Sequence, residues 1–206
     1  MKKLLATVLV CVFFVLSVGC SESNFETAYS EPELTIEELC ESGNYNEAYQ
    51  KAAEGEKRNI WIENQVAALC VEAIDGLKDP TSFQLRKAYC NSGDTGIVLQ
   101  ILATNGFGAK VTSYYLYIWD NDEANWSYYC SVSDLADDEY KSYDDTEDRL
   151  EKALKNVGRS MMRNAINNGV ELSKDAIKRI NKHFEEDTLD DIDLLDHNMS
   201  SETVTY

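Results

Sequence analysis

The clearest pattern along the chain is a run of apolar residues three and four positions apart between residues 62 and 77. This spacing places them all on one stripe of a helix, and such a stripe must pack against another apolar surface. Asp79 and Pro80 end the pattern, because proline disfavours helical backbone at the residue before it and lacks an amide hydrogen. The stripe consists of Ile62, Val66, Leu69, Cys70, Ala73, Ile74 and Leu77.

Beyond Pro80 the pattern changes to extended segments that are rich in apolar and aromatic residues. We expect four strands, at residues 83–90, 97–103, 111–119 and 126–132, separated by clusters of turn-forming residues. The second segment is apolar on both faces and therefore predicts the most buried strand. Consecutive short strands joined by tight turns favour an antiparallel sheet.

Helical patterns flank this central part on both sides. Residues 36–55 indicate a helix, a Gly-Asn turn and a second helix, and residues 145–184 indicate another pair. In the second pair, Asn167-Asn168-Gly169 can end the first helix and Ser173 can cap the next. The predicted fold class is therefore α+β: a small antiparallel sheet of about four strands on an amphipathic helix, with an N-terminal helical hairpin and a C-terminal helical pair.

Two short motifs in the central part resemble a small α+β module of bacterial envelope proteins. The first is Leu77-Lys78-Asp79-Pro80-Thr81-Ser82-Phe83, in which a helix leads into a strand. The second is Asn105-Gly106-Phe107-Gly108-Ala109, which links two later strands. The resemblance implies the fold of this part and carries no activity.

The first twenty residues resemble the signal of a bacterial lipoprotein. Two lysines precede an apolar run over residues 4–16, and Ser17-Val18-Gly19-Cys20 places a small residue before a cysteine. The resemblance implies cleavage before Cys20 and attachment of diacylglycerol to its sulfur. Ser17 stands where such signals favour an aliphatic residue, so a secretory peptide cut nearby or an uncleaved membrane anchor is the alternative.

These patterns divide the chain into four parts. We expect a signal peptide at 1–19, a tether at 20–35, one α+β body at 36–184 and an acidic, disordered tail at 185–206. The tail has one alternative, a short amphipathic turn around residues 187–196 that docks on a partner. Within the body we expect the hairpin at 36–55, the central helix and sheet at 62–132, and the helical pair at 145–184.

The acidic charge restricts the classes of partner. The formal net charge is −18, and loss of the first 19 residues leaves 17 Lys and Arg against 37 Asp and Glu, a net charge of −20. Nucleic acids and anionic lipids require basic surfaces, so neither is expected as a direct partner. The eight carboxylates between residues 134 and 148 lack the ligand order and glycine of an EF-hand loop, so they favour a solvated loop over a calcium site.

Four cysteines remain after the lipidation candidate Cys20. An even number in a protein outside the cytoplasm suggests disulfides, and we expect Cys90 to pair with Cys130 and Cys40 with Cys70. Cys70 lies on the apolar stripe, so a buried free thiol is the alternative there. The spacings do not suit zinc, and we expect no metal and no cofactor.

Aromatic residues concentrate in the third and fourth expected strands. Alternation places Tyr115, Tyr117 and Trp119 on one face of the third strand, and Trp126 begins the fourth. If this face is open, the four rings form a candidate site for a glycan or a peptide. If the C-terminal helices cover the face, the rings belong to the core.

Candidate catalytic residues are few. The only histidines are His183 and His197, at the end of a helix and in the acidic tail, so a triad built on histidine has no core member. A small hydrolase that uses two carboxylates is the least favoured possibility.

We therefore expect a non-enzymatic lipoprotein on the extracytoplasmic face of the cell membrane. It would be anchored by its N-terminal lipid and act as a binding or assembly factor for another envelope protein. The main alternative is a surface lipoprotein that binds glycan or peptide through the aromatic face.

Overall fold

The structure, a computed structural model, describes residues 33–136 and 146–186, together with 188, 192 and 194–197. The expected signal peptide with Cys20, most of the tether and the acidic residues 137–145 therefore lie outside the described residues. From Leu34 onward the described residues pack as one unit. Among the described residues, no helix combines the length and the apolar character that crossing a membrane requires.

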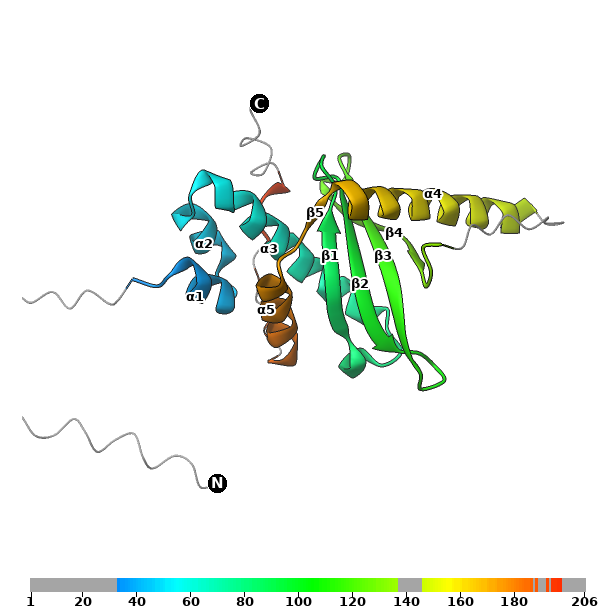
Figure 1. Ribbon diagram of the computed structural model, residues 1–206, viewed down its shortest axis with the longest axis horizontal. Coiled ribbons are helices and arrows are strands. Elements are labelled where there is room, and N and C mark those ends of the chain that lie inside the picture. The colour runs from blue at the N-terminus through cyan, green and yellow to red at the C-terminus, as the bar shows by residue number, and fades with distance from the viewer. Residues whose placement is uncertain (1–32, 137–145, 187, 189–191, 193, 198–206) are drawn as a thin grey trace, which may run out of the picture. The chain divides into compact units, whose positions relative to one another are not determined.

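Among the described residues, five antiparallel strands form one sheet in the order β4-β3-β2-β1-β5 (Figure 1). The first four are consecutive hairpins that confirm the expected sheet: β1 (Gln84–Cys90), β2 (Gly96–Thr104), β3 (Lys110–Asp120) and β4 (Asn125–Val132). The fifth strand, β5 (Val170–Glu171), was not expected. It pairs with the end of β1, where Tyr89 faces Glu171 and Cys90 faces Val170, and it joins the two C-terminal helices.

In the described part of the chain, five α-helices and one 3-10 turn complete the fold. The expected hairpin is α1 (Ile36–Glu41) and α2 (Tyr45–Lys51), the central helix is α3 (Glu54–Asp75), and the C-terminal pair is α4 (Thr146–Asn168) and α5 (Lys174–Glu185). The 3-10 turn, Pro80–Ser82, lies between α3 and β1. Because the first six residues of α3 are exposed or half-buried and carry no apolar stripe, the apolar pattern predicted its start too late.

Local capping explains where two of these helices begin. Thr35 and Glu38 form a reciprocal capping box at the start of α1. The Ser173 hydroxyl accepts a hydrogen bond from the Ala176 amide at the start of α5, as its sequence predicts.

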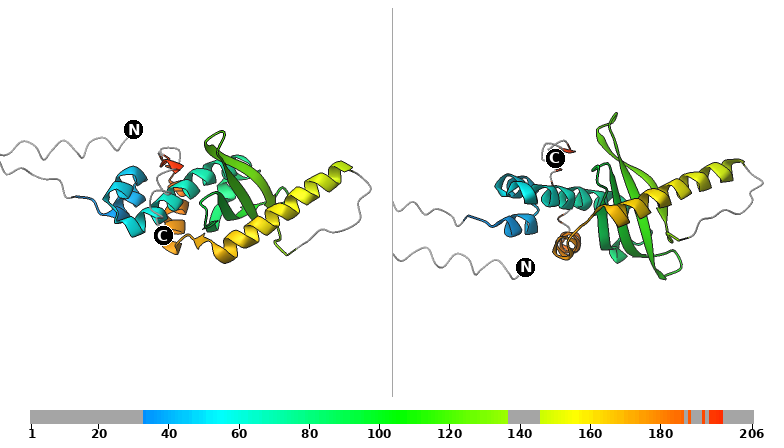
Figure 2. Two further views of the ribbon diagram at one scale, coloured as in Figure 1. Left: turned by 90° about the horizontal axis from the view of Figure 1, so that it is seen from above. Right: turned by 45° about the horizontal axis from the view of Figure 1, so that its top comes forward.

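The sheet lies between α3 on one face and α4 on the other (Figure 2). Alternation along β2 and β3 produces both cores, because successive side chains point to opposite faces. Ile97, Leu99 and Tyr117 belong to the core on the α3 side. Val98 and Leu116 belong to a second core with Met162 and Ala165 of α4.

Gly158 allows α4 to cross β4 closely. A Cβ atom at this position would overlap the Cys130 sulfur and would lie 3.3 Å from the Tyr129 ring. Glycine is therefore required by the distance between the helix and the strand.

All four body cysteines are buried free thiols, which corrects the expected disulfides. Cys90 and Cys130 lie on β1 and β4, three strand spacings or about 14 Å apart, whereas disulfide-bonded Cα atoms lie within about 7 Å. Cys40 lies beside His183, whose Nε2 donates to the Cys40 carbonyl oxygen at 3.0 Å, and Cys70 is fully buried in α3. The structure therefore agrees with the alternative prediction for Cys70, a buried free thiol.

The end of the chain also differs from its prediction as a loose tail. Leu195 is only 3% exposed, and residues 194–197 lie against α3 and the end of the β3–β4 hairpin. The segment binds through the buried Leu195 side chain and through backbone hydrogen bonds, and side-chain patterns do not predict the latter.

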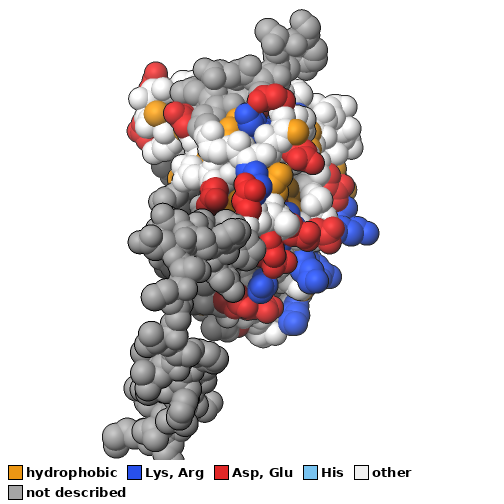
Figure 3. Space-filling model, turned by 90° about the vertical axis from the view of Figure 1, so that its left-hand side faces the viewer, with side chains coloured by type: hydrophobic (Ala, Val, Ile, Leu, Met, Phe, Trp, Pro, Cys, Tyr) orange, Lys and Arg blue, Asp and Glu red, His pale blue; other side chains and the backbone are white. Residues whose placement is uncertain are grey.

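The surface around α1 and α2 carries carboxylates and basic side chains side by side (Figure 3). Hydrophobic side chains appear in this view as small, separate patches. The described residues that are visible from this side therefore show no extended apolar surface.

Candidate functional site

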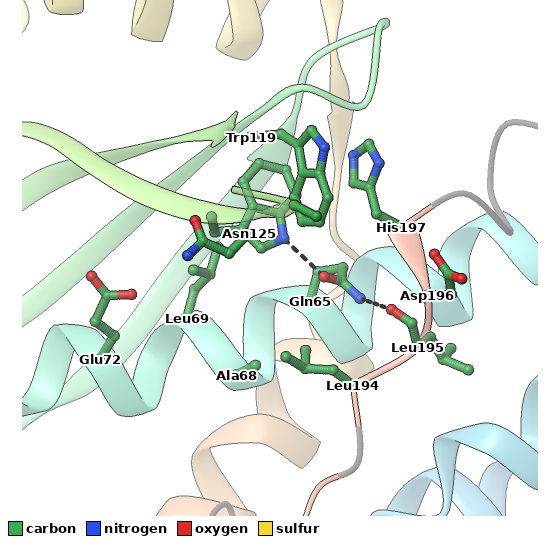
Figure 4. Close-up of a pocket in the computed structure, with 12 residues that line it drawn as sticks. Gln65, Ala68, Leu69, Glu72, Trp119, Asn125, Leu194, Leu195, Asp196 and His197 are labelled. Atoms are coloured by element: carbon green, nitrogen blue, oxygen red, sulfur yellow. Dashed lines mark hydrogen bonds between the residues drawn. The ribbon is translucent and has the colours of Figure 1, made fainter. Parts of the chain in front are cut away.

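A cavity of about 370 Å³ lies between α3, the β3–β4 hairpin and the C-terminal residues 194–197 (Figure 4). Each of these three parts supplies one wall. The lining residues are Gln65, Ala68, Leu69, Glu72, Trp119, Ala124, Asn125, Trp126, Leu194, Leu195, Asp196 and His197.

Two of the expected aromatic residues, Trp119 and Trp126, meet at this cavity. The antiparallel register of β3 and β4 places them directly opposite each other, and their rings make an edge contact with centroids 5.5 Å apart. The turn between them is tight, so both indoles lie near the end of the hairpin.

His197 completes the aromatic cluster from the far end of the chain. Its ring lies parallel to Trp119, with centroids 3.8 Å apart, and makes edge contacts with Trp126 and Trp61. Its Nε2 donates to the Asp94 carbonyl oxygen at 2.8 Å. Asp94 is in turn held by Arg58 of α3, at 2.7 Å, so the imidazole has a fixed position.

Three side chains of α3 bind the backbone of the C-terminal segment. Asn64 Oδ1 accepts a hydrogen bond from the Leu195 amide at 2.8 Å, and Gln65 Nε2 donates to the Leu195 carbonyl oxygen at 2.8 Å. Trp61 Nε1 donates to the Asp196 carbonyl oxygen at 3.1 Å. Burial of Asn64 and Gln65 would be costly without such partners, and the segment supplies them.

Gln65 also orients Trp126. The Trp126 Nε1 donates to Gln65 Oε1 at 2.8 Å, while the Gln65 amide nitrogen donates to Leu195 and to Asn64. The amide is thus fully engaged within the protein. The side chains that remain to offer polar groups at this end of the cavity are Glu72 and Asn125, which lie on the same side of it (Figure 4).

Partial burial raises the pKa of Glu72 above its ordinary value. The carboxylate lies on the face of α3 that looks toward the hairpin (Figure 4). A cationic group in the cavity would offset this loss of solvation.

The other two expected aromatic residues, Tyr115 and Tyr117, do not line the cavity. Tyr117 is 1% exposed in the core against α3, and burial raises the pKa of its hydroxyl, so it is a core residue. Tyr115 is half-buried and packs near Tyr128, with ring centroids 6.5 Å apart. The core on this face is built by α3 and, beside β1, by α5 of the C-terminal pair, whereas α4 of that pair lies on the other face.

A second feature of interest is an apolar stripe on α4. Leu150, Leu154, Val157 and Met161 are 63%, 46%, 51% and 36% exposed, respectively, and they recur at the spacing of one helix face. The first turns of α4 extend beyond the edge strand β4 (Figures 1 and 2). We call these four residues the α4 stripe.

A larger cavity, of about 530 Å³, lies between α1, α3 and α5, but its central carboxylate is neutralised. Arg179 forms two hydrogen bonds with Glu63, at 2.7 and 2.8 Å, and Tyr45 donates to the same carboxylate at 3.0 Å. Glu63 is therefore part of a buried structural network. Among the described residues, no group of three or more His, Cys, Asp and Glu side chains is arranged to hold a metal ion.

Sequence reasoning missed Asn64, Gln65 and His197. The only available signal was the apolar pair at Leu194 and Leu195 within the acidic tail, which suggested a docking turn without indicating its target. Comparison with protein-family models, with curated proteins and with solved structures found no match to this chain.

Proposed function

We propose that the protein is a lipid-anchored, non-enzymatic binding protein of the bacterial envelope, which recognises another envelope protein through the α4 stripe. The observation that carries this proposal is the exposure of four large apolar side chains on consecutive turns of one helix. Exposed apolar surface of this kind typically marks an interaction site.

The dimensions of the α4 stripe suit an amphipathic helix as the partner segment. From Leu150 to Met161 the stripe extends about 16 Å along the axis, at a helical rise of 1.5 Å per residue. A partner helix with apolar residues three and four positions apart would bury such a stripe along its length.

The α4 stripe is held in place by contacts on the other side of the helix. Arg159 Nε donates to the Asp134 carbonyl oxygen at 3.2 Å, and Arg163 Nη1 donates to the Leu135 carbonyl oxygen at 2.9 Å. Together with the close packing at Gly158, these bonds fix the rotation of α4 about its axis. A surface that is ordered before binding loses less entropy when a partner docks.

The membrane anchor is supported by the sequence around Cys20. Two acyl chains on one residue give stable membrane attachment, because each buried methylene contributes about 0.8 kcal/mol. We expect Cys20→Ser to move the protein into the soluble fraction on cell fractionation. Unchanged sedimentation with the membranes would contradict lipidation.

The binding function is tested by photo-crosslinking in living cells. A photoreactive residue at Leu150 or Met161 should crosslink one envelope protein reproducibly, and Leu154→Glu should abolish the product. The matched control is Ser160→Glu, which adds the same charge at an exposed position off the α4 stripe and should leave crosslinking intact. Equal crosslinking in both variants, or a second copy of this chain as the only product, would contradict the proposal.

One observation favours a second binding function. Trp119 and Trp126 line a cavity at the protein surface, so part of the expected aromatic face is available to a ligand. Small-ligand sites typically combine apolar walls with a few polar groups, and this cavity has that composition.

A further inference from the structure

The chemistry of the Trp119–Trp126 cavity narrows the class of ligand that it can bind. Its charged lining side chains are Glu72 and Asp196, and the described residues that line it include no Lys or Arg. The chain as a whole carries a net charge of −18. The local and overall potentials therefore both disfavour an anion and favour a cation.

The aromatic walls point to the same class. The indole N–H of Trp126 is bonded to Gln65, so this ring offers the cavity its carbon surface and π-electrons rather than a hydrogen-bond donor. Tryptophan is the side chain whose face attracts cations most strongly. One face of Trp119 is covered by the stacked His197 ring, whereas Trp126 is half-buried, lines the cavity and makes only T-shaped contacts with Trp119 and His197.

The polar side chains of the cavity also suit an ammonium group. Because the Gln65 amide is engaged on both its oxygen and its nitrogen, Glu72 and Asn125 are the side chains placed to bond a ligand beside the indoles (Figure 4). A sugar would need several donors and acceptors around its ring. An ammonium group, with three donors and a charge, is satisfied by a carboxylate, an amide oxygen and an aromatic face.

We propose that this cavity binds the aliphatic ammonium group of a cationic ligand, with Trp126 as the aromatic wall and Glu72 as the counter-ion. The proposal rests on the second, ligand-binding function. The ammonium group can belong to a small free amine or to a lysine side chain of a protein partner, and both present the same chemistry to the cavity.

The test follows the three tryptophan indole N–H signals of the full chain, purified in detergent, by NMR. The probes are 1-aminopentane, an acetylated and amidated Gly-Gly-Lys-Gly-Gly peptide, and the neutral analogue 1-pentanol. The Trp119 and Trp126 signals should shift with both amines, and by more than the signal of Trp61, which does not line the cavity but contacts the lining residues Asp196 and His197. Tighter binding of the peptide would identify a protein as the source, and tighter binding of 1-aminopentane would identify a free amine.

Two matched variants test the roles of the residues. Glu72→Gln keeps the size of the side chain and should weaken binding of the amines about tenfold, because it removes a charge-assisted hydrogen bond. Glu123→Gln removes the same charge from an exposed residue of the β3–β4 turn that does not line the cavity, and should leave affinity unchanged. Higher salt should weaken binding to the unmodified protein.

These titrations distinguish failure of the ammonium proposal from failure of the ligand-binding function. Equal affinity for 1-pentanol and 1-aminopentane, or equal loss in both variants, would overturn the ammonium proposal while leaving a ligand-binding cavity. N-acetylglucosamine is titrated in the same way as a test for glycan binding. Shifts with this sugar but with neither amine would show that the cavity binds a glycan and not an ammonium group. No shift of Trp119 or Trp126 with any of these probes would overturn both the ammonium proposal and the ligand-binding function.

Discussion

The His197 imidazole lies parallel to the Trp119 indole, with ring centroids 3.8 Å apart and planes inclined by 5°. The two residues are 78 positions apart in the sequence, and their contact closes one wall of the cavity. Removal of the ring should therefore change both the stability of the protein and the environment of Trp119.

We expect His197→Ala to lower the free energy of unfolding by about 1 kcal/mol, the usual contribution of an aromatic pair. Tryptophan fluorescence should also change, because one face of the Trp119 indole would become open to water. Urea unfolding and emission spectra provide the measurements. His197→Phe keeps an aromatic ring and should retain the emission spectrum, so the same spectral change in both variants would contradict a stacking role.

The ion pair between half-buried Arg179 and buried Glu63 should contribute strongly to the stability of the protein. Arg179→Met leaves the Glu63 carboxylate buried and unpaired, which should cost about 3–5 kcal/mol of unfolding free energy. The double variant Arg179→Met/Glu63→Gln removes that charge and should recover part of the loss. A double variant no more stable than the single one, in urea or thermal unfolding, would show that the charge is not the cause.

Gly158 should tolerate no larger side chain. We expect Gly158→Ala to cost about 1–3 kcal/mol, because the added methyl group overlaps the Cys130 sulfur. Cys130→Ala removes that sulfur, so the double variant should lose less than the sum of the two single variants. Additive losses in a double-mutant cycle would place the strain elsewhere, at the Tyr129 ring.

The buried thiols should make the protein sensitive to alkali. Burial raises the pKa of Cys40 from its ordinary value of 9.0 to about 11, chiefly through loss of solvation, with the nearby Glu63 charge adding to the shift. Below pH 9 the thiol is protonated in both the folded and the unfolded states, and the full stabilisation is present. As the pH rises from about 9 to about 11, the unfolded thiol ionises first, so this stabilisation is lost.

The unfolding free energy should thus fall more steeply with pH in the unmodified protein than in Cys40→Ala over this range. Urea titrations at pH 8 to 11 measure the two slopes. Parallel slopes would assign the alkaline sensitivity to other groups, first to Cys70 and Cys90, because burial raises the pKa of these thiols further than that of Cys40.

Local patterns explain which parts of the fold the sequence predicted. The four long strands and the turns between them depend on alternation and on turn residues within a few positions, so the register that places Trp119 opposite Trp126 follows from the hairpin itself. The two-residue strand β5 is too short to show alternation. Its pairing depends on β1, about eighty positions earlier, as the register of Cys90 with Val170 shows.

The missed part of the candidate site depends on contacts across most of the chain. Asn64 and Gln65 are polar residues within an otherwise apolar stretch of α3, and their role becomes visible only when Leu195, 131 positions after Asn64, lies against them. The disulfides were wrongly expected for a similar reason. An even number of cysteines does not reveal that two strands, β2 and β3, lie between Cys90 and Cys130.

The hydrogen bond between Asn64 and Leu195 also bears on how the protein is made. Ribosomes and export channels release a chain from its N-terminus, so α3 and the hairpins emerge long before residues 194–197 do. Until then Asn64 and Gln65 lack their bonds to the Leu195 backbone, and the groove that they line stays open. Arrival of residues 194–197 is therefore the step that closes this groove, and a chain truncated before Leu195 should keep the sheet but leave the groove open.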